Sequence, residues 1–476
     1  MARRRRNETR RAHRAVAVGA VSRCHDQACR VAERTLAEEL AEESDAGHVQ
    51  TGRGGDSAAH CPHAKAGLAL LAVVLMAGTS AQATQAAART YAWTAGVAVA
   101  PPEHGRQRAE TALAGHGDRL WLSYLDAAYG RRSDSGSWVA WPRKVTLFTS
   151  PDQGKNWQAL PNLSEMGGDE ALTTDQTGAL YAGWIRYFYD ADKRLKQRAA
   201  VARVGADGKA GPLIECLPWE PLSTAHDQTS LASASGSGIH VVATDIHPRH
   251  RGQPQLLYAR ATAEGTSCQH AQRLGTIGAL PQAGETTAGL VIAGPKGYVT
   301  SADGGGTFSP PHPRPFADKL ARLAVSPDRT TVYVTGDSAW NGIWVHASED
   351  GGRTWRRTEV VRIGPAKGWR FPVVHADKTG RVHVVWMEDG AGIGALYHAH
   401  SGDRGKTFSP PVRISDTPFP FPAKAPPPPP GTQDGSWIGD YIALTSTKET
   451  LIVAWSDQRA GPSLATVYVT VGRIAE

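Results

Sequence analysis

Carboxylates and aromatic side chains recur at the points where successive predicted β-strands begin. Clustered carboxylates raise one another's pKa, so a group of them can provide both a general acid and a general base. Aromatic rings among them suit the apolar faces of sugar rings. In an alternative role, the same acids cap strands and bind water in a solvated channel. The positions are Glu110, Asp169, Glu170, His226, Asp227, Glu285, Trp369, Arg370, Gly439, Asp440 and Tyr441.

A unit of four short β-rich runs, recurring from residue 90 onward, must position these residues. The runs are broken by Gly, Asp, Pro and Asn, and no helical period is evident. The units begin at or near residues 110, 169, 227, 285, 319, 369 and 436, a spacing of 34–67 residues. This spacing predicts an all-β chain folded as a β-propeller of seven four-stranded blades. Six blades are the alternative, because the unit that begins near Glu285 is short. The first residues of the inner strands are then expected at the mouth of the central channel.

The last unit contains only three β-rich runs, whereas an isolated run at residues 90–98 precedes the first unit. We expect this N-terminal run to supply the missing outer strand of the last blade. Such closure removes an open sheet edge that would otherwise invite aggregation.

A hairpin of the pattern Ser-x-Asp-x-Gly-x-Thr/Asn-aromatic occurs at residues 150–157, 301–308, 348–355 and 401–408. The Asp carboxylate can accept hydrogen bonds from backbone N–H groups of its own turn, and the Gly supplies a positive φ. The aromatic residue is expected to pack the hairpin onto its neighbour.

These four hairpins resemble the Asp-boxes of the bacterial neuraminidase repeat, which is found in sialidases and in other β-propeller proteins. The resemblance covers about residues 90–476. It implies that the hairpins lie at the blade periphery and support the fold, away from any active site.

A sialidase of this kind holds the substrate carboxylate with three Arg residues, since the planar guanidinium binds carboxylate bidentately. It uses a Tyr paired with a Glu as nucleophile and an Asp as acid/base. The resemblance therefore implies Tyr441 as nucleophile, with Glu170 or Glu285 activating it. Asp227 and Asp440 are the further catalytic candidates.

The first Arg of the family lies in an Arg-Ile-Pro motif on the first blade, and the first unit of this chain has no such motif. The nearest match is Trp369-Arg370-Phe371-Pro372, on the sixth unit. Trp369 and Arg370 are thus candidate substrate-binding residues, and Arg459 is a second candidate Arg. In the alternative role, each Arg merely pairs with a neighbouring acid.

Residues 418–430 are rich in proline, which favours an extended polyproline II arm. Because the arm connects an outer strand to the next inner strand, Phe419 and Phe421 are candidates for the wall of the channel mouth. The alternative is a stiff spacer.

Residues 63–83 have the features of a secretory signal peptide. Lys65 precedes a 13-residue apolar core, and Ala81-Gln82-Ala83 has the small-x-small form of a cleavage site. A core of this length is too short to span a bilayer comfortably, and a buried helix is the alternative. We expect residues 1–62 to be a non-native or disordered extension and the mature protein to be secreted or periplasmic.

Of five Cys, only Cys216 and Cys268 follow the expected cleavage site. An even pair in an exported protein is typical of a disulfide, which would contribute roughly 4 kcal/mol in the chain-entropy model. Two buried thiols are the alternative, because the two residues fall on outer strands of neighbouring blades, which diverge.

The resemblance and the acidic, aromatic mouth together favour a secreted sialidase-like glycoside hydrolase, of the exo-alpha-sialidase type, that acts on exposed glycans. The alternative is a non-catalytic propeller that binds a glycan or protein partner. The formal net charge of +7 is too dispersed to indicate a nucleic-acid partner. No cofactor and no metal ligand spacing is evident, and we expect a monomer without a membrane span.

Overall fold

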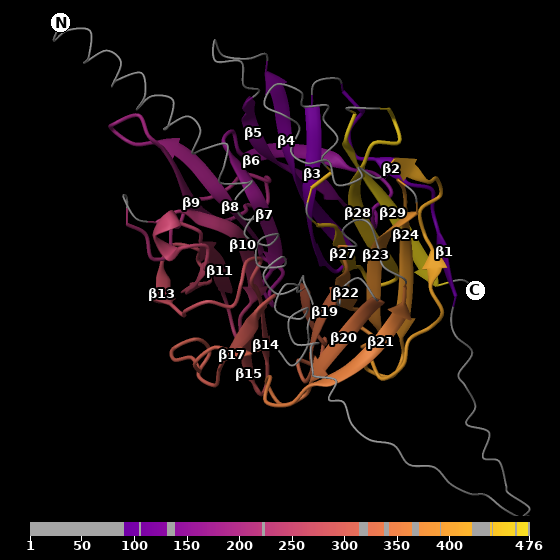
Figure 1. Ribbon diagram of the computed structural model, residues 1–476. Coiled ribbons are helices and arrows are strands. Elements are labelled where there is room, and N and C mark those ends of the chain that lie inside the picture. The colour runs from indigo at the N-terminus through magenta and orange to yellow at the C-terminus, as the bar shows by residue number, and fades with distance from the viewer. Residues whose placement is uncertain are drawn as a thin grey trace, which may run out of the picture. The chain divides into compact units, whose positions relative to one another are not determined.

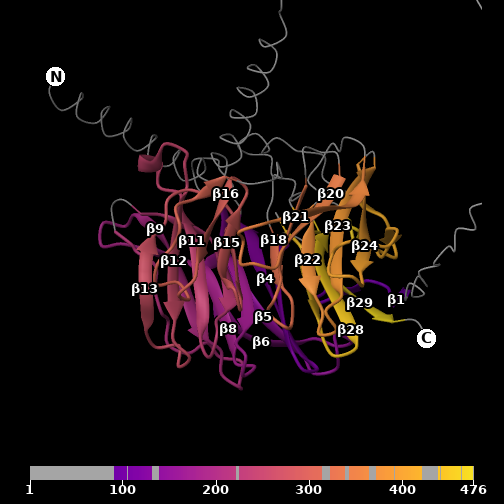
Figure 2. The same cartoon turned by 90° about the horizontal axis from the view of Figure 1, so that it is seen from below.

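Seven antiparallel sheets succeed one another along the chain and surround a common centre (Figure 1). Figure 2 shows the same sheets from the side. The structure is a computed structural model that describes residues 90–103, 106–130, 139–220, 224–313, 322–337, 342–363, 371–390, 392–420, 438–439, 441–461 and 464–474. These residues lie in one compact unit, Arg89–Glu476. The expected signal segment and the extension before it lie outside the described residues.

Each sheet is a blade whose strands follow one another from the innermost outward. Blade 1 contains β3 (Arg106–His116), β4 (Arg119–Gly130), β5 (Val139–Ser150) and β6 (Gln158–Ser164). Blade 2 contains β7 (Gly167–Thr174), β8 (Leu180–Tyr189) and β9 (Leu195–Arg203). Blade 3 contains β10 (His226–Ser233), β11 (Ile239–Asp245), β12 (Gln255–Ala261) and β13 (Cys268–Arg273). Blade 4 contains β14 (Gln282–Thr286), β15 (Gly289–Gly294), β16 (Gly297–Ser301) and β17 (His312–Pro313). Blade 5 contains β18 (Arg322–Val325), β19 (Val332–Asp337), β20 (Gly342–Ser348) and β21 (Arg356–Arg362). Blade 6 contains β22 (Val373–Ala376), β23 (Val382–Gly390), β24 (Ile393–Ser401), β25 (Val412–Arg413) and the short β26 (Phe419–Pro420). Blade 7 contains β27 (Ala443–Ser446), β28 (Thr450–Asp457) and β29 (Thr466–Ile474), together with β1 (Tyr91–Trp93) and β2 (Val97–Ala98).

The inner strands form a closed ring. Each inner strand contacts that of the next blade, in the order β3, β7, β10, β14, β18, β22 and β27, and β27 contacts β3 again. The chain is therefore a seven-bladed β-propeller. The seven-blade prediction is confirmed, and the six-blade alternative is wrong because the short fourth unit forms a complete blade.

The core is divided among the seams between neighbouring blades. Seven clusters of buried apolar side chains each join two adjacent blades. Trp184 fills the seam between blades 1 and 2, Trp386 that between blades 5 and 6, and Trp455 that between blades 6 and 7; all are fully buried. Because alternate residues of a strand face opposite sides, both faces of each blade are apolar.

The predicted ring closure by the N-terminal run is confirmed. The run divides into β1 and β2, which both pair with β29 in antiparallel orientation, with Tyr91 opposite Ile474 and Val97 opposite Val469. The last blade thus combines the two ends of the described chain.

The four Ser-x-Asp hairpins join the third and fourth strands of blades 1, 4, 5 and 6, as expected. In the hairpin of blade 5, the Ser348 hydroxyl donates to Asp350 at 2.8 Å and accepts the Gly352 N–H at 2.8 Å. The Thr354 N–H and hydroxyl both donate to the Asp350 carboxylate, at 2.9 and 2.6 Å. The packing also follows the prediction, since Trp355 lies against the apolar seam between blades 4 and 5.

Several strand boundaries differ from the sequence expectation. The fourth blade begins at Gln282, so Glu285 lies near the end of the inner strand instead of at its start. The outer strand of blade 3 begins at Cys268, where a strand ending near that residue was expected. The expected fourth run of blade 2 forms only an isolated bridge, between Ile214 and Val201.

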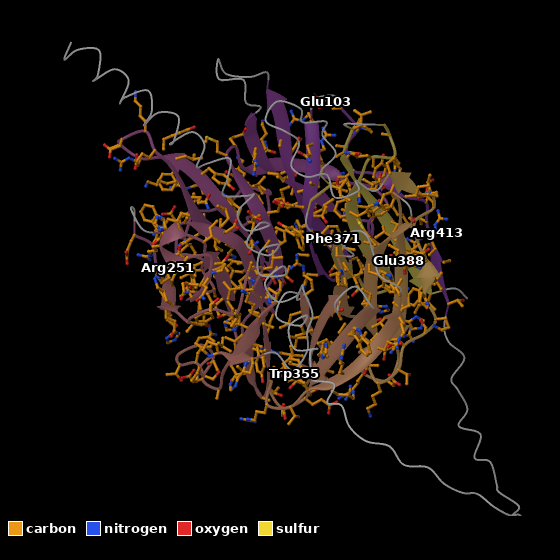
Figure 3. The ribbon with its side chains drawn as sticks, in the orientation of Figure 1. Glu103, Arg251, Trp355, Phe371, Glu388 and Arg413 are labelled. Carbon is orange, nitrogen blue, oxygen red and sulfur yellow. A yellow bond between two sulfur atoms is a disulfide. The ribbon has the colours of Figure 1, made fainter. Side chains whose placement is uncertain are left out.

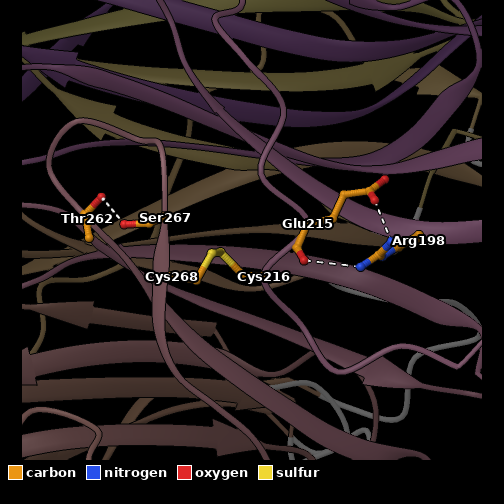
Figure 4. Close-up of a disulfide and its surroundings, with 6 residues drawn as sticks. All are labelled: Arg198, Glu215, Cys216, Thr262, Ser267 and Cys268. Atoms are coloured by element: carbon orange, nitrogen blue, oxygen red, sulfur yellow. Dashed lines mark hydrogen bonds and ion pairs between the residues drawn. A yellow bond between two sulfur atoms is a disulfide. The ribbon is translucent and has the colours of Figure 1, made fainter.

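Cys216 and Cys268 form a disulfide that joins blade 2 to blade 3 (Figure 4). Their Cα atoms are 5.5 Å apart, so the outer segments of these two blades do not diverge at this point. The disulfide thus links the outer segment of blade 2, which pairs with β9 only through the bridge at Ile214, to the outer strand of blade 3.

The proline-rich arm does not place Phe419 at the channel mouth. Phe419 is fully buried in the seam between blades 6 and 7, where β26 pairs with β24. Phe421 lies outside the described residues. Among the residues that are described, no helix has the length and apolar character needed to cross a membrane.

Candidate active site at the channel mouth

The inner strands of blades 1, 2 and 3 share an irregularity near their first residues. Glu110, Asp169 and Gln228 have φ values of 57°, 50° and 56°, and each lies at a shift of strand register. Such bulges change the direction of the following side chains and are common beside active sites. A left-handed backbone conformation at a Glu or Gln residue lowers stability by about 1 kcal/mol or more. Its repetition in three blades indicates that a requirement other than stability maintains it.

Blades 6 and 7 continue this pattern at the same end of the ring. Phe371 precedes β22 with φ 44°, and Gly439 precedes β27 with φ 88°. Figure 3 labels Phe371 near the centre of the ring. The start of the inner strands is therefore a circle of unusual backbone conformations around the channel.

Tyr441 lies within this circle, on the segment that leads into β27. Burial raises the pKa of its phenol well above the ordinary value, and the negative charges of Glu110 and Asp169 add to the effect. The Arg322 guanidinium lies 5.1 Å from the centre of the Tyr441 ring and opposes the shift. Charged groups of blades 1, 2 and 5 thus act on one phenol of blade 7.

Tyr187, at the end of β8, is a second phenol in the same electrostatic environment. Burial raises its pKa above the ordinary value; the Arg143 charge acts in the opposite direction, and the charges of Asp169, Asp227 and Glu110 reinforce the increase. Tyr187 is close to the inner strand, because a Cβ added to Gly168 would lie 3.6 Å from the Tyr187 hydroxyl.

Glu170 is a deeply buried acid of the same group. Only 3% of its surface is exposed, and the backbone N–H groups of Glu170 and Leu125 offset the effect of burial on its carboxyl only in part. Burial raises its pKa well above the ordinary value, and the adjacent Asp169 charge contributes. Both effects favour the protonated form of Glu170. We use the name mouth cluster for Glu110, Arg143, Asp169, Glu170, Tyr187, Asp227, Arg322 and Tyr441.

The structure brings together five of the residues singled out in the sequence, namely Glu110, Asp169, Glu170, Asp227 and Tyr441. Asp440, Trp369 and Arg370 lie outside the described residues, so the predictions for these three residues stay predictions.

Glu285 does not join the mouth cluster, because it lies at the opposite end of its strand, next to the turn between β14 and β15. It accepts hydrogen bonds from the Ser235 N–H, from His240 and from Arg329, the last at 3.0 Å. Burial opposes ionisation of Glu285, but the hydrogen bonds outweigh it and lower the pKa to about 2. Glu285 is therefore a paired, ionised carboxylate, and the prediction that it activates Tyr441 is wrong by position.

Arg459 is held by two acids after strand β28. It lies 2.8 Å from Asp457 and 2.8 Å from Asp416, and its guanidinium stacks 4.4 Å from the centre of the Tyr468 ring. This geometry corresponds to the alternative role from the sequence, in which the Arg pairs with neighbouring acids.

Tyr187, Arg143 and Arg322 were not identified from the sequence. Arg322 starts an inner strand, which is the position used to select the other candidates, but the start of the fifth unit was placed near Lys319. Tyr187 and Arg143 lie on second and third strands, where the rule of inner-strand starts gives no signal.

A metal centre is not evident in the part of the chain that the structure describes, where no group of three or more His, Cys, Asp or Glu side chains could hold an ion. The mouth cluster instead offers a buried acid with a raised pKa, ionisable carboxylates and phenols. Such a set can donate a proton, accept a proton and form a covalent bond through oxygen.

The chain matches no protein-family model, and no curated protein is similar to it in sequence. Its structure is similar to that of a protein of unknown function from Dyadobacter fermentans, with 11% identity, a TM-score of 0.48 and coverage of 81% of this chain and 99% of that one. It is also similar to an alpha-L-arabinanase from Penicillium chrysogenum, with 10% identity, a TM-score of 0.45 and coverage of 80% and 99%. A Hadza microbial sialidase gives 13% identity, a TM-score of 0.46 and coverage of 80% and 68%. At these identities and scores the similarities carry no argument about chemistry.

Proposed function

We propose that the protein is a glycoside hydrolase that acts on exposed glycans at the mouth cluster. The observation that supports this proposal is the Arg322 guanidinium against the Tyr441 ring, in a place where the charges of Glu110 and Asp169 act on the phenol and the buried Glu170 follows Asp169 in the chain. Glycoside cleavage needs a proton donor for the leaving oxygen and a group that stabilises or attacks the anomeric carbon. Both types are present within this group.

In the proposed reaction, Glu170 is the general acid. Its raised pKa keeps the carboxyl protonated where an exposed Glu would be ionised, so it can give a proton to the leaving oxygen. Tyr441 is the nucleophile. Because its pKa is also raised, the phenol must lose its proton during the attack, and Glu110 or Asp169 is the nearby acceptor.

The finer proposal is a sialidase-type enzyme that acts on a carboxylate-bearing sugar. A neutral phenol is a better nucleophile than a carboxylate next to an anionic sugar, because it avoids repulsion between like charges. Arg322 and Arg143 are the cations whose charges act on the two phenols of the cluster, and they are the candidates for pairing with the substrate carboxylate. Arg370 remains the third candidate.

We also propose export of the protein, to the periplasm or outside the cell. The Cys216–Cys268 disulfide supports this, since disulfides persist mainly in oxidising compartments.

The test is hydrolysis by the purified full chain of a sialoside with an alkyl leaving group and of a fluorogenic aryl sialoside, with matched neutral glycosides in parallel. Replacing a general acid matters most when the leaving group is poor. Glu170→Gln is therefore expected to lower kcat on the alkyl glycoside about 100-fold or more and to affect the aryl glycoside much less. Glu359→Gln, which changes a partly exposed acid of β21 paired with Arg362, is the matched control.

Equal losses on both substrates would contradict the role of Glu170. Turnover of neutral glycosides alone would keep the hydrolase and reject the sialidase type.

A non-catalytic propeller that binds a glycan or protein partner is the second candidate. The observation in its favour is that Glu170 is almost completely buried, so a substrate could reach its carboxyl only if neighbouring groups moved. This candidate predicts no turnover of any glycoside, together with saturable binding on a glycan array that the Tyr441→Phe variant weakens.

A further inference from the structure

Four histidines gather where blade 6 meets the N-terminal strand β1. Asp377 and His383 are 3.1 Å apart, from Oδ2 to Nε2, and the His383 Nδ1 lies 3.1 Å from the His398 Nε2. If Asp377 accepts the Nε2–H of His383, the neutral His383 ring has only an acceptor at Nδ1, so His398 donates to it. The His398 ring in turn stacks on that of His400, with centroids 5.7 Å apart. His375 is the fourth member of this histidine stack, and its Nε2 lies 2.7 Å from the Ser446 hydroxyl.

Strand β1 rests on the histidine stack through its aromatic side chains. The Tyr91 ring meets His383, His398 and His400 edge-on, with centroid distances of 5.5, 5.3 and 5.4 Å. Trp93 meets His398 at 5.2 Å. Arg381 donates to the Tyr91 hydroxyl at 3.0 Å. Both views of the ribbon place β1 beside β24, the strand that carries His398 and His400 (Figures 1 and 2).

The balance of charge around the stack favours neutral imidazoles. Asp377 is the one acid that faces the histidines among the described groups, and Arg381 is already a cation beside them. His383 and His398 are almost completely buried. A protonated histidine in the stack would add a positive charge close to the Arg381 guanidinium, and the single negative charge of Asp377 would not balance both. The titratable and charged groups that face the stack from β1, β22, β23 and β24 and their connecting turns are Tyr91, His375, Asp377, Arg381, His383, His398 and His400.

The direction of the pH effect follows from these contacts. Burial lowers the pKa of His375 and His400 to about 4 and lowers the pKa of His398 well below its ordinary value. A histidine released from the stack binds its proton near pH 6.5, so the released state holds more protons between pH 6.5 and 4. The closed state is therefore fully favoured above pH 6.5 and loses stability as the pH falls toward 4.

We propose that the histidine stack makes ring closure pH-dependent, so that strand β1 is held on blade 6 at neutral pH and is released in acid. Tyr91 and Trp93 lose their flat, uncharged support when the stack becomes charged. Release breaks the backbone pairing of β1 with β29, including the bond from the Thr94 N–H to the Val471 carbonyl at 2.9 Å. The outer edge of β29 is then open in acid at Gly472–Ile474, the part that pairs with β1.

Hydrogen–deuterium exchange of the purified full chain at pH 7 and pH 4.5, corrected for the intrinsic exchange rate, tests this proposal. A single histidine that stays neutral in the closed state, with β1 bound, lowers the hydrogen-exchange protection of β1 by up to about a hundredfold over the two pH units below 6.5. We expect a loss of this size in the peptide that contains residues 91–94. The outer strand β21, which has no histidine, serves as the internal reference and is expected to keep its protection.

The variant His398→Phe keeps an aromatic ring in the stack but cannot be protonated. It is expected to lose less protection of residues 91–94 at pH 4.5 than the parent does, because one proton-binding group is removed while His375, His383 and His400 remain. The control His312→Phe changes an exposed histidine that stacks on Tyr298 in blade 4, and it is expected to lose protection like the parent. Unchanged protection of the parent at pH 4.5, or equal loss in His398→Phe, would overturn the proposal. If a thermal melt shows that His398→Phe does not fold, the half-buried His400→Phe is measured in its place, with the same outcomes.

Discussion

Gly439 of the last blade lies directly against Glu110 of the first blade. A Cβ at Gly439 would be 2.7 Å from the Glu110 backbone nitrogen and 3.1 Å from its Cγ. Both residues have positive φ, 88° for Gly439 and 57° for Glu110. The contact therefore connects ring closure to the mouth cluster, because the seam between the two blades holds Glu110 in its unusual conformation beside Tyr441.

Gly439→Ala is expected to lower the free energy of unfolding by about 2–3 kcal/mol, since it combines an unfavourable φ with a collision against backbone. Gly380→Ala is the matched control, because Gly380 has φ 83° but open space where the Cβ would lie. It is expected to cost about 1 kcal/mol. Chemical denaturation of both variants measures the difference, and equal losses would show that the contact with Glu110 is not important.

Asp350→Ala is expected to lower stability by about 1–2 kcal/mol without changing catalysis. The substitution removes the acceptor for the Ser348 hydroxyl and for the N–H and hydroxyl of Thr354 at a hairpin far from the inner strands. Thermal melts and glycoside assays of the same preparation test this. Full stability with lost activity would place the hairpin in the reaction instead.

Much of the fold could be predicted from local pattern. The hairpin motif carries its own hydrogen bonds, and the unpaired first run and the incomplete last unit indicate ring closure. The start of blade 4 could not be found in this way, because Glu285 resembles the acids that begin other inner strands. In the structure Leu280, with φ 54°, precedes that strand. Glu285 accepts hydrogen bonds from His240 of blade 3 and from Arg329 of blade 5.

Asp245→Asn is expected to reveal a carboxylate that stabilises the fold only above acid pH. Burial opposes ionisation of Asp245, but hydrogen bonds from Arg273, the Ala225 N–H and His250 outweigh it and lower the pKa to about 2. The stabilisation is present above pH 3.8 and is lost as the pH falls toward 2. Denaturation as a function of pH should show a difference between parent and variant of about 2 kcal/mol at pH 7 that shrinks below pH 4. A difference that does not depend on pH would contradict the ionised state.

Removal of the Cys216–Cys268 disulfide is expected to lower the free energy of unfolding by about 2–4 kcal/mol, since the bond closes a loop with a sequence separation of 52. The double variant Cys216→Ser with Cys268→Ser and the reduced parent should melt at the same lowered temperature. A reductant should have no further effect on the double variant. If the parent melts at the same temperature with and without reductant, the disulfide does not contribute to stability.

The mouth cluster could be predicted only in part, for a physical reason. Tyr441, Glu170 and Asp227 were found because they share one position in a repeated unit. Tyr187 and Arg143 enter the cluster from second and third strands, and the charges that act on Tyr187 come from blades 1, 2 and 3. The sequence does not decide between a disulfide and two buried thiols for a similar reason, since the irregular outer segment of blade 2 determines how close Cys216 comes to blade 3.

The central claim is that Tyr441 performs chemistry, and the most direct test is the turnover of a fluorogenic sialoside by the full chain and by Tyr441→Phe. The account predicts measurable hydrolysis by the parent and a fall in kcat of about a thousandfold or more in the variant, with an unchanged melting temperature. Tyr298→Phe, which changes a tyrosine on the third strand of blade 4, is expected to keep the parent rate. A parent without turnover, or a Tyr441→Phe variant as fast as the parent, would contradict the account.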